Sequence, residues 1–187
     1  YLQTRNRAHQ LAHALNDAGI GIGDRVGTFM WNGSRHLEAY HACAGMGAVL
    51  HTLNIRLSPA DLEYIINHAQ DQYIFLDPDF LPLVESVAAQ CPDVKGWIVL
   101  TNAEHMPETS LSNVMCYETL VAAGDPSFDW PVLDENTACA LCYTSGTTGN
   151  PKGVLYSHRS TMLHAYATMM PDAMGLSRKD VVLPIVP

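Results

Sequence analysis

Lysine is scarce in this sequence. The chain has only Lys95, Lys152 and Lys179, against 19 Asp and Glu residues, and its formal net charge is −9. Proteins that bind nucleic acid or anionic membranes through general electrostatics carry a basic patch or an excess of Lys and Arg. The composition therefore predicts neither nucleic acid nor a membrane surface as a partner, and an anionic ligand would have to be held by local donors.

Long apolar runs and a regular cysteine pattern are also missing. No run approaches the ~18 residues of a membrane span, so we expect no transmembrane segment. No secretory signal is visible ahead of the first helical pattern. The five cysteines are odd in number and irregularly spaced, which is typical of reduced thiols and predicts a cytoplasmic protein. They are Cys43, Cys91, Cys116, Cys139 and Cys142.

What is present is the composition of a folded domain. Hydrophobic residues make up 48% of the 187 residues, enough to build a core. The first residues already have a helical pattern, and the final "VVLPIVP" has that of a strand. We therefore expect residues 1–187 to be part of a single large domain that is incomplete at both ends.

Predicted strands and helices alternate along the chain. Ser58 and Pro59 mark the clearest helix start, as N-cap and first-turn proline, and Ser34 is expected to cap an earlier helix. The alternation predicts an α/β fold with a mostly parallel sheet flanked by helices on both faces. The predicted strands are 26–30, 48–53, 72–77, 96–101, 138–144, 153–158 and 180–186. The predicted helices are 1–18, a helix that starts at 34 and ends at Gly45 or Gly47, and 58–69, 79–90, 117–123 and 159–170.

The stretch "YTSGTTGNPKGVLYSH", residues 143–158, interrupts this alternation with glycines, hydroxyls and one lysine. Glycines allow backbone conformations in which successive N–H groups form a nest for an anion. Hydroxyls add donors and can coordinate Mg²⁺, and Lys152 adds a compact positive charge. In a parallel sheet, such a loop at the carboxyl end of a strand lies where ligands bind. The stretch predicts a polyphosphate site.

Two other interpretations of this loop are less consistent with the sequence. A Walker loop requires Gly-Lys-Ser or Gly-Lys-Thr followed by a helix, whereas Lys152 lies between Pro151 and Gly153 and precedes a strand pattern. A plain hairpin normally has two to five loop residues, and this loop is longer.

The stretch "YTSGTTGNPKGV" resembles the phosphate-loop signature of the adenylate-forming, AMP-binding superfamily of acyl-CoA synthetases, luciferases and peptide-synthetase adenylation domains. The resemblance extends over the chain through "TRNRAHQLAHALNDAGIGIGDRVG", "HTLNIRLSPADLEYIINHAQ" and "VVLPIVP". The Asn54–Leu57 motif and the terminal "LPIVP" resemble the fatty acyl-CoA synthetase branch. The resemblance implies part of the N-terminal domain of such an enzyme, with the C-terminal domain absent.

The resemblance also implies an activity, acid–thiol ligation. A carboxylate, with a fatty acid expected, attacks the α-phosphorus of ATP, and the thiol of coenzyme A then displaces AMP from the acyl-adenylate. Thr144 and Lys152 are the expected catalytic residues, Thr144 is the expected Mg²⁺ ligand, and a homodimer is left open. The residues expected to bind the nucleotide phosphates are Thr144, Ser145, Gly146, Thr147, Thr148, Gly149 and Lys152.

Further family motifs, including a magnesium-binding glutamate and a second catalytic lysine, would lie beyond Pro187. We therefore expect residues 1–187 alone to be inactive. The alternatives are a Walker-type NTPase and a non-catalytic nucleotide-binding or interaction domain.

Several other residues were weighed as functional candidates. His9 and His13 nearly match HExxH, but Gln10 replaces the glutamate base, so a solvated helix face is expected. Cys139 and Cys142 are expected on opposite faces of a strand, as structural cysteines.

Near the end of the chain, Ser157 is expected to cap a helix rather than act as a nucleophile with His158, for which a supporting role near the phosphate loop is left open. The nearby methionines are expected to fill the core. Arg56 has no assigned role.

Overall fold

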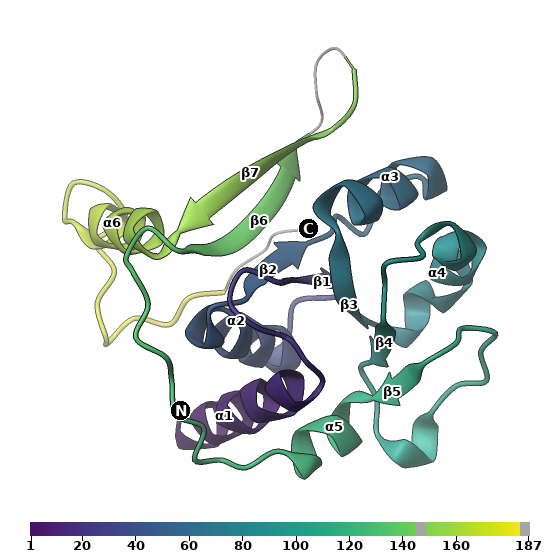
Figure 1. The fold of residues 1–187 in the computed structure, drawn as a ribbon. Coiled ribbons are helices and arrows are strands. Elements are labelled where there is room, and N and C mark those ends of the chain that lie inside the picture. Colours follow the sequence, from purple (N-terminus) through teal and green to yellow (C-terminus); the bar gives the residue numbers. More distant parts are fainter. Residues whose placement is uncertain (145–148, 184–187) are drawn as a thin grey trace.

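The computed structural model describes residues 1–144 and 149–183. They contain a seven-stranded sheet in the order β5-β4-β3-β1-β2-β6-β7, in which every neighbouring pair is parallel except β6 and β7 (Figure 1). This confirms the predicted mostly parallel α/β architecture. The strands are β1 (Arg25–Phe29), β2 (Val49–Thr52), β3 (Asp71–Leu76), β4 (Gly96–Val99), β5 (Val114–Cys116), β6 (Ala138–Thr144) and β7 (Lys152–Ser157).

Helices cover both faces of the sheet. On one face α1 (Leu2–Asp17), α2 (Ser34–Met46) and α5 (Tyr117–Ala123) enclose a core with the sheet residues Val26, Leu50, Phe75 and Ile98. On the other face α3 (Pro59–Ala69) and α4 (Leu81–Val87) pack on Phe29, Ile74, Leu76, Trp97 and Val99. Short 3₁₀ turns span Pro78–Phe80, Ala88–Gln90 and Ala103–His105. Within the described residues, no helix is both long and apolar enough to cross a bilayer.

The capping signals place two helices. Ser58 caps α3 by accepting a hydrogen bond from the Asp61 N–H, and Pro59 occupies the first turn, as predicted. The expectation for Ser34 was wrong by one residue, because Gly33 is the N-cap of α2 and Ser34 already lies in the first turn. The extended backbone of Gly33 starts the helix without a side-chain acceptor.

The sequence pattern does not predict β5. These three residues pair with β4 in register from Trp97–Val114 to Val99–Cys116 and form an edge of the sheet. A strand this short has no alternating pattern to detect, and pairing with β4 rather than local propensity stabilises it.

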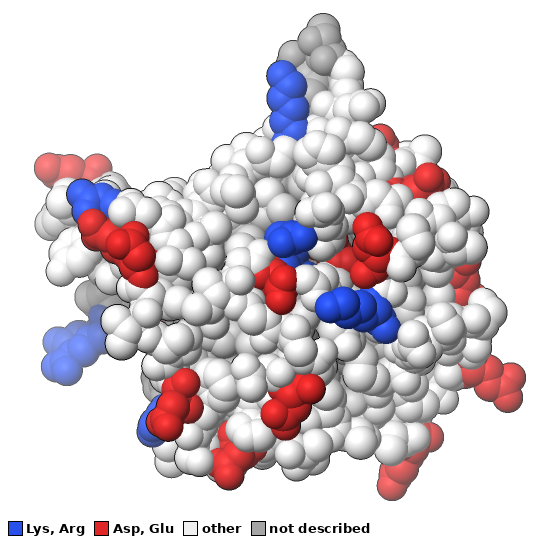
Figure 2. All heavy atoms as spheres, in the orientation of Figure 1, with Lys and Arg blue, Asp and Glu red and all other residues white. Residues whose placement is uncertain are grey.

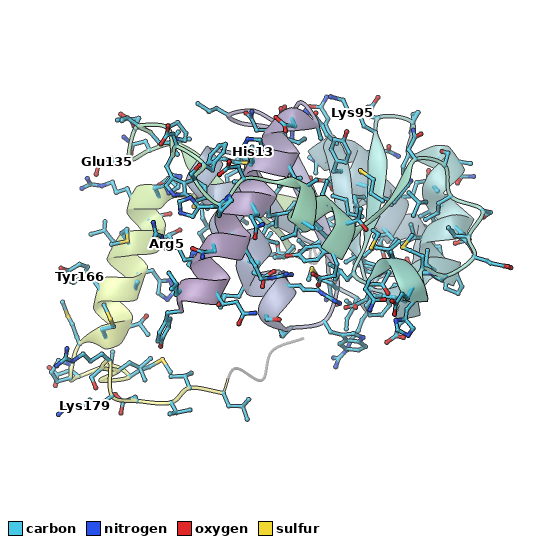
Figure 3. The ribbon with its side chains drawn as sticks, turned by 90° about the horizontal axis from the view of Figure 1, so that it is seen from below. Arg5, His13, Lys95, Glu135, Tyr166 and Lys179 are labelled. Atoms are coloured by element: carbon cyan, nitrogen blue, oxygen red, sulfur yellow. The ribbon has the colours of Figure 1, made fainter. Side chains whose placement is uncertain are left out.

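Two predictions for the C-terminal part were wrong. Helix α6 (His158–Met169) forms, but neither its methionines nor those that follow it fill the core: Met162 is 59% exposed, and Met169, Met170 and Met174 are also exposed. Figure 1 shows α6 beside the β6–β7 end of the sheet, away from α3 and α4, and in Figure 3 the Tyr166 side chain points outward from it. No described element covers its outer surface.

The strand predicted at residues 180–186 is absent over its described part. Val181, Val182 and Leu183 are exposed and belong to no strand. The remaining residues, 184–186, lie outside the described part of the chain. A strand needs a neighbour to satisfy its backbone groups, and none pairs with 180–183 among the described residues.

A charged cluster joins the three helices of the first face. Arg7 of α1 donates to Glu118 of α5 at 3.0 and 3.2 Å and to Glu38 of α2 at 2.8 Å. Arg35 donates to Glu118 at 2.9 Å, and the Tyr117 hydroxyl donates to Glu38 at 2.6 Å. Burial tends to raise the pKa of Glu118, but the hydrogen bonds and charges of both arginines outweigh it, and the net pKa is lowered.

The lowered pKa of Glu118 predicts pH-dependent stability. A carboxyl whose pKa is depressed by folding contributes stability above its unfolded pKa of about 4.3, and this contribution is lost as the pH falls through the folded pKa. We expect Glu118→Gln to lower the urea midpoint at pH 7 and to differ little from wild type at pH 3. Glu104→Gln, at an exposed position, is the control. An equal difference at both pH values would contradict the prediction.

Candidate functional site

The hairpin of β6 and β7 brings the two ends of the glycine-rich stretch together. The antiparallel register pairs Thr144 with Lys152 and Tyr143 with Gly153. Since β6 runs parallel to β2, the loop leaves the carboxyl edge of the parallel strands, as expected. The phosphate-binding candidates Ser145, Gly146, Thr147 and Thr148 lie outside the described residues. Thr144 and Lys152 therefore flank the loop on facing strands, and both are exposed.

A pocket of about 280 Å³ lies at this edge, between the carboxyl ends of β2 and β6. One wall comes from the hairpin and the other from the segment that links β2 to α3. This arrangement brings the Asn54–Leu57 motif beside Gly149 and Pro151 of the glycine-rich stretch, although the two are far apart in sequence. The lining residues are Thr52, Leu53, Asn54, Leu57, Asp61, Ile65, Tyr143, Thr144, Gly149 and Pro151.

Gly149 and Lys152 have properties suited to binding an anion. Gly149 has φ of +103°, a conformation that residues with a Cβ rarely adopt, and open space surrounds its Cα. No hydrogen bond or ion pair is found for the Lys152 ammonium among the described residues. On the face drawn in Figure 2, Lys and Arg side chains are few and interspersed with Asp and Glu. Lys152 is thus a cation whose charge the described residues do not neutralise.

The Asn54–Leu57 motif forms a turn. The Arg56 N–H donates to Asn54 Oδ1 at 2.9 Å, and the Leu57 N–H donates to the Asn54 carbonyl at 3.1 Å. The motif therefore shapes the second wall of the pocket through its backbone. Arg56 is exposed, and the structure gives its guanidinium no assigned role.

Beneath the hairpin lies a polar cluster that the sequence analysis missed. His51 of β2 and Asp71 of β3 are both fully buried, with His51 Nδ1 at 2.8 Å from Asp71 Oδ2. The Tyr143 ring lies 5.1 Å from the His51 ring, and the Tyr143 hydroxyl is 2.5 Å from Nδ1 of His68. Burial raises the pKa of Asp71, although the hydrogen bond and charge of His51 oppose that shift.

The supporting role left open for His158 is wrong. His158 follows the far end of β7, a strand of six residues, whereas the loop precedes its first residue. Six strand residues span roughly 20 Å, so His158 lies far from the loop. Ser157 caps α6 by accepting from the Ser160 N–H, which confirms the capping prediction.

The histidine pair of α1 has structural partners. His9 is buried rather than solvated. Its Nε2 accepts a hydrogen bond from the Trp130 indole N–H at 3.2 Å, and its Nδ1 lies 3.1 Å from the Phe128 carbonyl oxygen. His13 lies beside Asp17, one turn further along the helix. The expected solvated face was wrong for His9, since the segment 124–131 folds back over α1.

The cysteines Cys139 and Cys142 of β6 have different partners. Cys139 is buried, with its Sγ 3.4 Å from the Tyr156 carbonyl, while Cys142 contacts Thr52. Both are free thiols that pack within the sheet.

Taken together, the fold and the hairpin define an α/β protein with a glycine-rich, lysine-containing loop at the carboxyl edge of a parallel sheet. Residues 1–187 match the model of the AMP-binding enzyme family over the whole chain. The chain belongs to that family, which confirms the resemblance seen in the sequence.

Relatives and solved structures agree with this assignment. The chain is 49% identical over 180 residues to 3-methylmercaptopropionyl-CoA ligase of Ruegeria lacuscaerulensis, covering 96% of this chain and 33% of that ligase. It is 47% identical over 181 residues to medium-chain-fatty-acid–CoA ligase of Ectopseudomonas oleovorans, covering 97% and 33%. The crystal structure of the anthranilate CoA ligase AuaEII with anthranoyl-AMP matches with a TM-score of 0.80 and 25% identity, over 88% of this chain and 30% of that one. The chain thus spans about one third of the length of these relatives.

Proposed function

We propose that residues 1–187 are the phosphate-binding part of a longer acid–thiol ligase, which uses ATP to activate a carboxylate and transfers the acyl group to coenzyme A. Family membership over the whole chain supports the reaction class. The observation that carries the site is the pairing of Thr144 with Lys152 across the mouth of the glycine-rich loop. The names of the relatives support the acceptor, since both ligases act with CoA.

In the proposed reaction, ATP is a substrate whose β- and γ-phosphates bind the loop of residues 144–152. When the carboxylate oxygen attacks the α-phosphorus, the bond to the bridging oxygen of pyrophosphate breaks and negative charge develops on the leaving group. In this proposal Lys152 and the N–H and hydroxyl groups of the loop stabilise that charge, which is how most phosphoryl-transfer sites act. No covalent enzyme intermediate is required.

Magnesium would need few protein ligands at this site. Thr144 supplies a hydroxyl at the loop, and Mg²⁺ bound to nucleotides usually takes one or two protein ligands besides phosphates and water. Among the residues the structure describes, no group of three His, Cys, Asp or Glu side chains could hold a metal. We therefore propose Thr144 as one ligand of a nucleotide-bound Mg²⁺, which would neutralise charge on the phosphates.

The proposed carboxylate substrate is a fatty acid. The two ligases named above differ in substrate, one acting on a sulfur-containing propionate and the other on medium-chain fatty acids. Both are carboxylates with an apolar tail, and the proposal is limited to that class.

The test uses the complete polypeptide that contains this chain, with ATP, CoA and carboxylates of increasing chain length. We expect carboxylate-dependent release of AMP and pyrophosphate and formation of an acyl-CoA, detected by mass spectrometry. The isolated residues 1–187 are expected to show no turnover. Release of ADP and phosphate without a carboxylate would favour a Walker-type NTPase instead, and nucleotide binding without turnover of any carboxylate would favour a binding domain.

A further inference from the structure

We propose that Tyr143 is a positioning residue, held by His68 and Gly153, which sets the direction in which the chain leaves β6 and enters the phosphate loop. This inference rests on the proposed function, because the loop matters only if it binds the phosphates of ATP. It adds Tyr143 and His68 to the proposed site. Neither side chain is needed for the phosphate chemistry itself.

The contacts of Tyr143 restrain it on two sides. Its hydroxyl is 2.5 Å from Nδ1 of His68 on α3. Its ring lies against Gly153 on the facing strand, where a Cβ would approach the ring carbons to 3.2 and 3.4 Å. Thr144, the next residue, begins the loop. The residue that precedes Thr144 is therefore restrained both across the hairpin and by α3.

Helix α3 supplies both this restraint and part of the pocket. His68 stacks on Tyr64 one turn earlier, with ring centroids 5.3 Å apart. Asp61 and Ile65 of the same helix line the pocket beside Thr144. Through the hydrogen bond between His68 and Tyr143, the end of β6 and the opposite wall of the pocket are joined to the same helix.

The buried pair of His51 and Asp71 supports Tyr143 from the sheet. The His51 ring lies 5.1 Å from the Tyr143 ring at an interplanar angle of 44°. His51 is held by two contacts with the Asp71 carboxylate, at 2.8 and 3.0 Å. Tyr143 thus has a fixed aromatic neighbour beneath it, as well as the polar partner on α3.

The protonation state of Tyr143 allows it to donate to His68. Burial, with the nearby Asp71 and Tyr64, raises the pKa of the Tyr143 hydroxyl to about 12. The hydroxyl therefore keeps its proton at neutral pH and can donate to Nδ1 of His68. Since His68 is exposed, water can replace this hydrogen bond, and its loss is expected to change the geometry of the loop more than the stability of the domain.

The experiment compares Tyr143→Phe with wild type in the complete polypeptide. We expect KM for ATP and the calorimetric Kd for ATP to rise about five- to tenfold, the scale of one lost hydrogen bond. KM for the carboxylate and for CoA, and the Tm, are expected to stay at wild-type values. His68→Ala should reproduce the effect, His68→Asn should restore part of the affinity, and the double variant Tyr143→Phe/His68→Ala should be no worse than either single variant.

Tyr73→Phe is the matched control, since it removes a tyrosine hydroxyl whose partner, the Ala18 carbonyl, lies away from the hairpin. Equal ATP affinity in Tyr143→Phe and wild type would overturn the inference while leaving the proposed function intact. A fall in Tm with equal increases in every KM would also overturn it, because that pattern indicates a merely structural role. Failure of wild type to activate any carboxylate would overturn the proposed function, and the ATP titrations would still decide the role of Tyr143.

Discussion

Replacing Lys152 with Met is expected to lower kcat/KM for acyl-adenylate formation by about 100-fold or more in the complete polypeptide. The substitution keeps the length of the side chain and removes its charge. Removing one preorganised donor from a site that stabilises developing charge costs about 10²–10³ in rate. The loss should be large here because Lys152 is the only lysine of the β6–β7 hairpin, and the chain has only three lysines. Pyrophosphate-exchange kinetics measure the effect directly.

Lys95→Met is the matched control for this experiment. Lys95 precedes β4 at the amino end of the strands and donates to Gln72 at 2.7 Å, far from the carboxyl edge where the hairpin loop lies. It should keep wild-type activity. The fold of the Lys152 variant should also be intact, because that side chain is exposed and makes no contact that stabilises the described structure. If the Lys152 variant kept more than half of wild-type activity, Lys152 would not belong to the proposed site.

The second large effect is expected for the buried pair beneath the hairpin. Asp71→Ala should lower the free energy of unfolding by about 2–4 kcal/mol, because it leaves the buried His51 side chain without its partner, which costs about 1–3 kcal/mol, and opens a cavity as well. Both side chains are fully buried, so water cannot replace the missing partner. Gly27 lies directly against this pair, since a Cβ there would approach Asp71 Oδ2 to 3.3 Å, and little space is left for rearrangement. Urea titrations at pH 7 measure the change.

A double variant separates the pair from the general cost of a cavity. If the two residues interact as the geometry indicates, the loss for His51→Leu/Asp71→Leu should be clearly smaller than the sum of the two single losses, because no polar group is left unpaired. Asp93→Ala, at an exposed position, should change stability by less than about 0.5 kcal/mol. Additive losses for the two buried positions would show that they act independently.

Much of the fold followed from local signals in the sequence. Ser58 and Pro59 placed the start of α3, because helix capping depends only on neighbours along the chain. The alternation of strands and helices was sufficient to predict parallel pairing. The position of the phosphate loop at the carboxyl edge followed from that pairing.

The features that the sequence did not predict depend on contacts between residues far apart along the chain. Tyr143 and His68 are 75 positions apart, and no local pattern connects them. The buried state of His51 and Asp71 depends on the neighbours of β2 and β3 in the sheet. The methionines of α6 failed as a prediction for the same reason, since periodicity indicates an apolar side chain but not which element, if any, covers it.

The strand order also sets a sequence of events during synthesis. Strand β6 pairs with β2, and Leu50 meets Ala140 about ninety positions later in the chain. At roughly 5–20 residues per second, the ribosome needs on the order of 5–20 s to make the intervening segment. Strands β1 to β5 can pair during that interval, and β6 must then join an existing edge of the nascent sheet. Strands β1 to β5 are thus available for pairing before the glycine-rich loop is made, and the β6–β7 hairpin joins the sheet after them.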